Sequence, residues 1–488
     1  MRNRRNDEGR KIKNRKLPPG PKRLPIIGNL HQLGNLPHRS LQRLSQDYGP
    51  LMFLQLGSIP TLVISSADVA REIFKGYDLV FSGRPLTFTA KRLSDNCSDI
   101  TFAPYGDYWR EIRKITILEL LNIKRVLSFR AVREEEVDLM VASISSSSSS
   151  IPINLSEMTL CFTNNVICRV AFGRKYEGGG SNREALFYRI LKETQELLGS
   201  FSISDFFPWM EWINKVNGLQ GRVEKTFHKL DNFYNKVIDE HLDPSKSKPQ
   251  QEDLVNVLLR VQKDSTQGMS LTRDQIKGVL TDMFIAGTDT TAATVIWTMA
   301  ELIRHPNTMK RTQEEVRRVI GRKQKVEEND LPRLNYLKLV VKEALRLHPP
   351  TPLLVPRETM EDCTIKGYDI QAKTRVFINA RSIATDKKYW DNPEEFQPER
   401  FLHNSINFKG LDFELLPFGA GRRGCPGIDF SVVLIELVLA NILHCFDWKL
   451  PSGVEVADLD MTEAVGLTMH KKSHLLLVAT TANIGINE

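Results

Sequence analysis

The six cysteines of this 488-residue sequence form none of the common paired patterns. They are Cys97, Cys161, Cys168, Cys363, Cys425 and Cys445, and no two of them make a CxxC pair or a CxxCH haem-attachment motif. The sequence therefore lacks the spacing of a zinc cluster and that of a disulfide framework. Unpaired cysteines of this kind are typical of a reduced compartment such as the cytosol.

Long apolar runs are also missing. The nearest approach to one, Val432 to Leu443, is interrupted by Glu436 and Asn441, so it does not have the composition of a transmembrane helix. The N-terminus does not have the pattern of a signal peptide, and no internal repeat is visible, which disfavours solenoids and propellers. No GxGxxG motif follows a predicted strand, so the sequence carries no nucleotide-binding fingerprint of its own.

Most of the chain lacks an excess of either charge. Of the 67 Lys and Arg and the 59 Asp and Glu residues, ten basic and two acidic ones lie within residues 1–23, so the remainder carries 57 of each sign. The net charge of +8 thus belongs to the N-terminal segment, which is compatible with a solvated tail, with nucleic-acid binding or with an anionic membrane. Each Lys or Arg near such a membrane contributes about 1 kcal/mol. The proline-rich "LPPGPKRLPIIGN" that follows favours stiff, extended geometry, and a basic segment before a stiff hinge is typical of a chain whose membrane anchor, ahead of it, is missing.

What the sequence does contain is mostly helical periodicity, with short strand signals at 51–57, 60–65, 374–380 and 474–480. This pattern predicts a mainly α fold with small β-sheets, and no boundary divides residues 24–488. The clearest helix is predicted from about Thr272 to Arg304, because Thr272 and Gln275 fit a capping box and Pro306 stops the helix. It would span about 50 Å, enough to cross the molecule. Two further helices are predicted at 105–114 and 335–350.

The middle of the long helix, "AGTDTTAAT", has a composition that is poor for a helix. Ala286 and Thr290 are four residues apart and share a face, whereas Asp289 points about 100° away from Thr290. One interpretation is a buried, threonine-rich helix whose hydroxyls bond its own carbonyls. The other is a functional acid beside a functional hydroxyl.

Two other pairs are ambiguous in the same way. Trp109 and Arg113 share a helix face and offer one N–H donor and a rigid guanidinium, but a buried Trp above a surface Arg is the simpler interpretation. Glu343 and Arg346 are spaced i,i+3, and an exposed pair of this kind stabilises a helix by only about 0.2–0.5 kcal/mol.

The stretch "LLPFGAGRRGCPGI" at 415–428 surrounds Cys425 with four glycines and places two arginines before it. Glycine loses more backbone entropy on folding than any other residue, so four of them in nine residues indicate close approach to something flat or bulky. Cys425 is the side chain there that can bind a metal. An inert buried cysteine would account for Cys425 but for none of the glycines.

Taken together, these motifs resemble those of the cytochrome P450 family of haem-thiolate monooxygenases. The family's cysteine-loop pattern FxxGxRxCxG is matched by Phe418, Gly421, Arg423, Cys425 and Gly427. The proline-rich hinge, WxxxR at 109–113, AGxDTT at 286–291, ExxR at 343–346 and PERF at 398–401 follow in the family's order. The wording "LPPGP", "AGTDTT" and "FGAGRRGCPG" is similar to that of plant microsomal members of specialised metabolism, and the resemblance covers 17–488.

The resemblance implies a cytochrome P450 fold, with a long central helix over a haem and a C-terminal cysteine loop. Residues 1–23 would be a basic juxtamembrane tail with the start of the hinge, and 24–488 a single haem-binding monooxygenase domain. Cys425 would be the axial thiolate of the haem iron, and thiolate ligation favours O–O cleavage. The other residues implied to bind the haem are Trp109, Arg113, Arg357, Phe418, Gly419, Arg423 and Gly427. Glu343 and Arg346 would form a buried ion pair extended by Arg400.

Asp289 and Thr290 would then relay protons during oxygen activation, with Ala286 leaving room for the substrate. The stretches that line the family's substrate pocket contain Ala286, Leu353, Leu354, Val355, Leu467 and Thr468, with Ile100, Phe102 and Phe201 as weaker candidates. Because these residues are largely apolar, we expect a small apolar substrate, such as a terpenoid or an alkaloid.

The resemblance also implies O2 as co-substrate and electrons supplied from NADPH by a flavoprotein reductase that docks on the cysteine side, where Arg110, Lys114 and Arg422 are basic. We expect a monomer on the cytosolic face of the endoplasmic reticulum membrane, held through its N-terminal region after an anchor absent here, with no nucleic-acid partner. The leading prediction is an NADPH- and O2-dependent monooxygenase that hydroxylates or oxidatively rearranges its substrate. The alternatives are a haem-thiolate isomerase or dehydratase acting on a preformed peroxide, for which a proton relay is unnecessary, and a haem-binding sensor or carrier without turnover.

Overall fold

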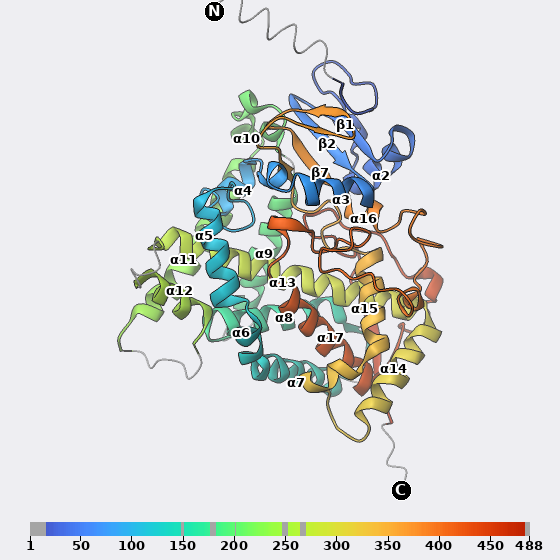
Figure 1. The fold of residues 1–488 in the computed structure, drawn as a ribbon. Coiled ribbons are helices and arrows are strands. Elements are labelled where there is room, and N and C mark those ends of the chain that lie inside the picture. The colour runs from blue at the N-terminus through green and yellow to red at the C-terminus, as the bar shows by residue number, and fades with distance from the viewer. Residues whose placement is uncertain are drawn as a thin grey trace, which may run out of the picture.

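A computed structural model describes residues 16–147, 151–175, 182–200, 202–245, 252–263 and 270–483. Helices supply most of its bulk, and the sheet that contains β1 (Leu51–Leu56), β2 (Ile59–Ile64) and β7 (Arg375–Ile378) lies at one end (Figure 1). The helices are α2 (Pro37–Tyr48), α3 (Ala67–Gly76), α4 (Phe88–Leu93), α5 (Asp107–Ile115), α6 (Ile123–Ser128), α7 (Arg130–Ser146), α8 (Leu155–Phe172), α9 (Asn182–Gly199), α10 (Ile213–Val216), α11 (Leu219–Leu242), α12 (Leu254–Lys263), α13 (Arg273–Arg304), α14 (Pro306–Ile320), α15 (Asn335–Leu347), α16 (Ala380–Ile383) and α17 (Ile428–Cys445).

The strands assemble into short sheets. The largest has the order β1 (Leu51–Leu56), β2 (Ile59–Ile64), β7 (Arg375–Ile378), β4 (Arg357–Glu358), and only its β2–β7 pairing is parallel. A second sheet contains β3 (Ile153–Asn154), β9 (Leu476–Thr481) and β8 (Phe446–Lys449), and a third pairs β5 (Cys363–Ile365) with β6 (Tyr368–Ile370). The predicted strand signals correspond to β1, β2, β7 and β9, and the mainly α fold with small sheets is confirmed.

The long helix α13 crosses the middle of the molecule (Figure 1). Its N-terminus is the predicted capping box, in which the Thr272 hydroxyl accepts from the Gln275 N–H and the Gln275 side chain accepts from the Thr272 N–H. Pro306 starts the next helix, so α13 ends at Arg304. Over 32 residues it extends about 48 Å. It packs against α8, α15 and α17, and a loop before α17 carries Cys425 beneath it.

Helix α17 is part of the largest apolar core cluster, together with residues of α8, α13 and α15. Within the described residues it is the one helix with the length and apolar composition of a membrane-spanning segment, but 67% of it is buried inside the protein. Core packing explains its apolar sequence, because a helix that is apolar all round is also what the interior of a large protein requires.

Candidate active site

The cysteine loop is held by its own backbone. The Cys425 N–H donates to the Phe418 carbonyl at 2.9 Å, and the Gly424 N–H donates to the Gly421 carbonyl at 3.0 Å. Gly421 has a φ of +67°, and a Cβ placed on it would lie 2.3 Å from Oδ1 of Asp78, so a larger residue is excluded there on both counts. The loop therefore turns tightly between Phe418 and α17 and presents one sulfur at its tip.

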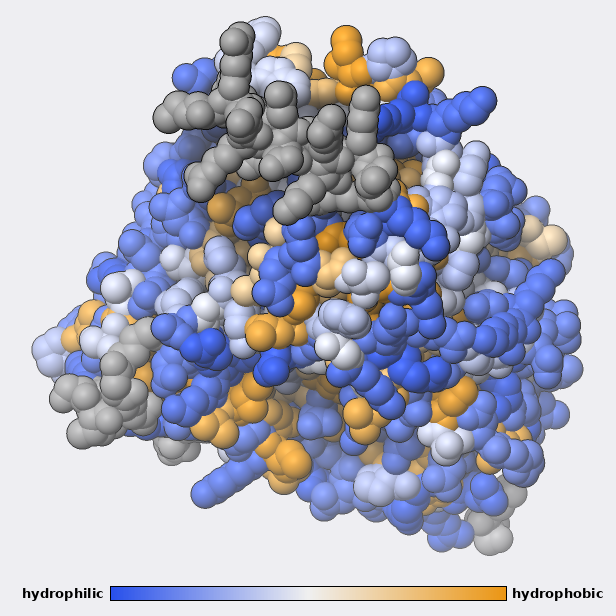
Figure 2. Space-filling model, turned by 45° about the horizontal axis from the view of Figure 1, so that its top comes forward, coloured by the Kyte–Doolittle hydropathy of each residue, from blue (hydrophilic) through white to orange (hydrophobic). Residues whose placement is uncertain are grey.

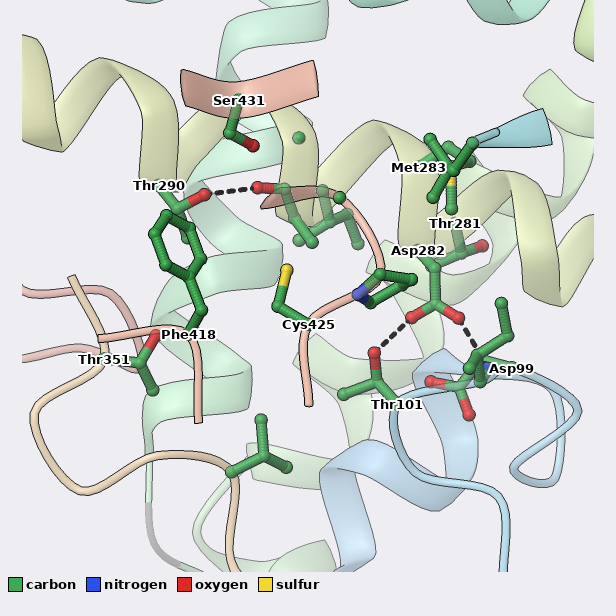
Figure 3. A pocket seen from close by; sticks show the side chains of 18 of the residues that line it. Asp99, Thr101, Thr281, Asp282, Met283, Thr290, Thr351, Phe418, Cys425 and Ser431 are labelled. Atoms are coloured by element: carbon green, nitrogen blue, oxygen red, sulfur yellow. Dashed lines mark hydrogen bonds between the residues drawn. The ribbon is translucent and has the colours of Figure 1, made fainter. Parts of the chain in front are cut away.

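The Cys425 sulfur points into an internal cavity between this loop and α13 (Figure 3). The accessible surface of Cys425 faces this cavity. Most of the residues expected to bind haem or substrate line it, and they come from segments far apart in the chain: Ile100, Phe102, Arg113, Ala286, Thr290, Leu354, Val355, Arg357, Phe418, Gly419, Arg423, Gly427, Leu467 and Thr468.

Two of the residues predicted to bind haem or substrate are separated from the cavity. Leu353 packs against the apolar cluster that includes Met52 and Leu54 instead. The Leu354 N–H closes a turn by donating to the Thr351 carbonyl at 3.0 Å, and residues 354 and 355 after it border the cavity. Trp109 does not line it either, because its indole N–H donates to the Ile100 carbonyl at 3.0 Å. Phe201 lies outside the described residues.

Four arginines border the cavity near Cys425: Arg84, Arg113, Arg357 and Arg423. The first, third and fourth are at most 8% exposed. Each guanidinium donates mainly to backbone carbonyls. Arg423 donates to those of Ser82, Ile100 and Ala103, and Arg113 to that of Gly424 at 2.6 Å. Arg423 also lies over the Trp109 ring, with its guanidinium carbon 4.1 Å from the ring centroid.

The nearby carboxylates, Asp99 and Asp78, oppose the effect of burial on the pKa of these arginines but do not offset it. Burial, with the neighbouring Arg357 and Arg113, lowers the pKa of Arg423 to about 9. Burial lowers the pKa of Arg357 to about 10, although Asp78 lies 3.5 Å from its guanidinium and opposes the shift. Burial, together with the positive charges of Arg423 and Arg357, lowers the pKa of Arg84. A group that carried carboxylates into this cavity would relieve the repulsion between these charges.

The arginines favour an anionic ligand, and the Cys425 sulfur favours a cationic one. Burial raises its pKa, while the Gly427 N–H and the charge of Arg113 act in the opposite direction. A thiol held in this way becomes a good ligand once a metal cation replaces its proton. Haem fits both requirements, because it carries an iron for the sulfur and two carboxylates for the arginines.

Opposite Cys425, α13 presents Thr290 to the cavity (Figure 3). The Thr290 hydroxyl donates to the Ala286 carbonyl at 2.7 Å, and the Thr294 and Thr298 hydroxyls likewise bond the carbonyls four residues earlier. Three of the threonines therefore behave as a buried helix requires. Asp289 does not line the cavity. Its Oδ1 pairs with Nε2 of His470 at 2.9 Å, and its buried Oδ2 has no hydrogen-bond partner in the described part of the chain.

The structure brings Glu343, Arg346 and Arg400 together. Arg346 donates twice to Glu343, both at 2.7 Å, and Arg400 Nε lies 3.0 Å from the same carboxylate. The side chains of Glu343 and Arg346 are completely buried. Arg346 also donates to the carbonyls of Ala384, Pro393 and Glu395, so it connects α15 to the chain that precedes the cysteine loop.

Sequence reasoning missed several residues of the cavity. Asp282 accepts from the Ile100 N–H and the Thr101 hydroxyl, both at 2.5 Å, and so fastens the loop at 100–102 to α13 (Figure 3). Burial raises its pKa to about 6. Asp282 precedes Ala286 by four residues, so the helical spacing already placed it on the cavity face. Arg84, which bonds the carbonyls of Thr101 and Val355, had no such local signal.

Comparison with known proteins agrees with this geometry. A family model described as "Cytochrome P450" matches residues 18–478. "Cytochrome P450 71A9" of Glycine max is 60% identical over 96% of this chain and 94% of that protein. "Strychnine-11-hydroxylase" of Strychnos nux-vomica is 58% identical over 95% of this chain and 91% of that protein. A solved structure of a zebra fish cytochrome P450 with progesterone is 27% identical, covers 91% of this chain and 99% of its own, and superposes with a TM-score of 0.78.

Proposed function

Because the chain belongs to the cytochrome P450 family, we propose that it is a plant-type, NADPH-dependent monooxygenase that oxidises a small, largely apolar specialised metabolite. The observation that carries this proposal is the position of Cys425. Its sulfur borders a cavity that is also lined by arginines bonded mainly to backbone carbonyls and by Thr290 of α13. Residues 24–488 would act as one haem-binding unit, with residues 1–23 as a basic segment and the start of the hinge.

The family's cofactor is haem, which when bound supplies the activation of O2 with electrons from a partner reductase. In this chain Cys425 would ligate the iron, and Arg113, Arg357 and Arg423 would bind the carboxylates. Charge-assisted bonds of that kind are about twice as strong as neutral ones. Phe418, Gly419 and Gly427 would lie against the ring, and the indole of Trp109 would support Arg423 from behind instead of bonding a carboxylate itself.

On the other face, Thr290 would hold a proton at its hydroxyl and Asp289 would deliver protons from outside the cavity. The intact Asp289–Thr290 pair favours monooxygenation over rearrangement of a preformed peroxide. Loss of the hydroxyl in Thr290→Ala should divert NADPH consumption from product to peroxide, while unchanged coupling would remove Thr290 from the mechanism.

The substrate side of the cavity supports an apolar substrate. Phe102, Leu354, Val355 and Leu467 border it, together with Ala286 on α13. Two relatives are named for oxidations of small molecules, the strychnine hydroxylase above and a phenylacetaldehyde oxime monooxygenase of Prunus mume that is 50% identical. We infer a substrate of that size, and a terpenoid or alkaloid skeleton fits the apolar lining.

We further propose that the protein works at the endoplasmic reticulum membrane and faces the cytosol. The Gly57 N–H in the turn between β1 and β2 donates to the Ile27 carbonyl of the segment at 24–27. The Ser58 N–H in the same turn donates to the carbonyl of Phe206, which precedes the segment at 209–216. These segments expose Ile26, Trp209, Trp212 and Val216, each by at least 60%. Figure 2, in which the sheet end of Figure 1 comes forward, shows apolar surface at this end.

The first experiment is the absorption difference spectrum of the reduced, haem-loaded protein with carbon monoxide. A strongly red-shifted band peculiar to thiolate ligation should appear, and it should be lost in Cys425→Ser. Cys363→Ser is the matched control, because Cys363 lies in β5 and does not border the cavity. A wild-type band typical of histidine ligation would overturn the assignment of Cys425. Absence of NADPH consumption with a reductase would leave only a haem carrier.

A further inference from the structure

The hairpin that supplies Leu467 and Thr468 to the cavity also carries His470. It is closed by the pairing of Glu463 with Lys471 and by the Ala464 N–H bond to the His470 carbonyl at 2.8 Å. Two further bonds to Met469 fix its position. The Trp297 indole N–H of α13 donates to the Met469 carbonyl at 2.8 Å, and the Met469 N–H donates to the Pro350 carbonyl at 2.7 Å. The main chain next to His470 is thus anchored to α13.

The His470 ring meets Asp289 at Nε2, 2.9 Å from Oδ1. The Asp289 side chain is 5% exposed, and its second oxygen, Oδ2, is buried without a partner among the described residues. A buried carboxylate oxygen without a hydrogen bond is costly, so its retention in a folded protein requires a reason. A site through which a proton must leave is such a reason.

The other charged groups around this pair are occupied elsewhere. The Glu463 carboxylate pairs with His38 and Arg39. The Lys471 ammonium donates to the Ser473 hydroxyl at 2.9 Å, and the His348 ring, beneath Trp297, pairs with Glu301. Burial alone would lower the pKa of His470, but the charge of Asp289 and its hydrogen bond raise it overall. The pKa of His470 is therefore raised by one carboxylate, that of Asp289.

His470 also has access to water that Asp289 lacks. Although protein surrounds most of the ring, 36% of the side-chain surface remains accessible. His470 is not among the residues that border the cavity. It thus connects the buried Asp289 to accessible surface, and Asp289 directly precedes Thr290 in α13.

We propose that His470 is a positioning and proton-supplying residue for Asp289, and that the pair stores one proton which enters from water through the imidazole. The inference rests on the proposed monooxygenase function and extends it. The N–H bond of the imidazolium at Nε2 breaks and an O–H bond forms at Oδ1, so the stored proton passes to the Asp289 carboxyl group. When that carboxyl group turns and gives the proton up toward Thr290, the carboxylate is restored, and the bare Nε2 of the neutral imidazole takes a proton from water. Supply weakens as the pH rises through the pKa of His470, because the imidazolium is the donor.

The direct test is a nuclear magnetic resonance titration of protein labelled at its ten histidines. The His470 signal is assigned by its loss in His470→Gln. We expect it to titrate above 6.5, the ordinary value, and to shift downward in Asp289→Asn. An unshifted titration in Asp289→Asn would overturn the pairing on which the proposal depends. This readout requires no turnover and therefore does not depend on the proposed function.

The second test distinguishes proton supply by His470 from a role in which it only holds Asp289 in position. His470→Arg keeps a cation beside Asp289 but cannot release a proton near neutral pH, whereas His470→Gln keeps a donor without the charge. We expect both to lose the high-pH decline of reductase-supported NADPH oxidation and to show a larger solvent isotope effect than wild type. His474→Gln, an exposed histidine in the following segment, is the control and should leave both unchanged.

Wild-type behaviour of His470→Arg would mean that only the charge matters and would overturn proton supply. A wild-type protein that shows the thiolate spectrum but consumes no NADPH would instead overturn the proposed function, while the titration result for the His470–Asp289 pair would stand.

Discussion

Two groups of buried arginines illustrate two uses of charge in this molecule. Arg346 in α15 has the carboxylate of Glu343 within 2.7 Å, and both side chains are fully buried. Arg423 and Arg357, beside Cys425, are almost as deeply buried, but backbone carbonyls are their main partners and their pKa values fall to about 9 and about 10. Arg346 is thus paired with a carboxylate of the chain itself, whereas Arg423 and Arg357 depend mainly on neutral carbonyl groups.

The partner of a buried arginine thus distinguishes a charge that supports the fold from one that binds a ligand. Burying an unpaired charge costs several kcal/mol, and arginine cannot avoid that cost by losing its proton near neutral pH. A cluster of such cations beside a cavity therefore indicates that the counter-ion comes from a ligand.

Removal of the carboxylate from the paired group should have the largest effect. In Glu343→Gln the side chain keeps its shape, but Arg346 and Arg400 are left without a counter-ion in the interior. We expect the free energy of unfolding of the haem-loaded protein to fall by about 3–5 kcal/mol, measured by chemical denaturation. Glu314→Gln is the control, because Glu314 in α14 is 66% exposed and lies 3.9 Å from an exposed lysine. A loss no larger than that of the control would mean that the carbonyls around Arg346 suffice.

Glu436 in α17 sharpens the comparison, because it is a buried charge of the kind that can be neutralised by a proton. Burial raises its pKa to about 7 from 4.5. The folded state thus keeps a proton that the unfolded state loses, so stability should fall as the pH rises from about 4.5 to about 7. Glu436→Gln should remove this loss and exceed wild type in stability by up to about 3 kcal/mol at pH 8, with little difference at pH 4. Denaturation curves of both proteins from pH 4 to pH 8 measure this difference in stability. A difference that does not change with pH would contradict the raised pKa of Glu436.

The unpaired group is tested through haem retention. Arg113→Met removes a cation whose pKa is lowered by burial and which donates to the Gly424 carbonyl. Loss of a charge-assisted bond costs about 1.5–3 kcal/mol, so the dissociation constant of haem should rise about 10- to 100-fold. Transfer of haem to an excess of apomyoglobin measures it. Stability of the haem-free protein should change much less than in Glu343→Gln, and an equal loss in both states would make Arg113 a structural residue.

The fold could be predicted from the sequence where its signals are local. The bounds of α13 agree with prediction to within a residue, because a capping box and a proline mark its ends. The strands β5 and β6, with three residues each, were not predicted, since so short a segment has no period to read. Ordered motifs led to Cys425, Arg423 and Thr290, which the structure collects around one cavity.

Residues whose importance depends on distant partners were not predictable in this way. Arg84 meets Val355 across 271 positions, and His470 of the C-terminal hairpin meets Asp289 of α13. Nothing in the local pattern around either residue reveals such a pairing. Leu353 lies in a turn, closed by the Leu354 N–H bond to the Thr351 carbonyl, that its sequence did not indicate, and it packs away from the cavity that its two successors border.

The exposed face of α5 should give the smallest effect on the protein itself. Arg110 is three residues before Arg113, but its side chain is 56% exposed and it pairs with Asp107 on the same helix. In Arg110→Glu we expect the unfolding midpoint and haem retention to match wild type, because solvent screens an exposed pair. Reduction by the partner reductase should nevertheless slow several-fold at low salt if this face guides docking. The difference should disappear as the screening length contracts from about 30 Å at 0.01 M to about 8 Å at 0.15 M salt. Lys310→Glu on α14, where the lysine is 78% exposed, should not slow reduction, and equal slowing in both variants would place the docking face elsewhere.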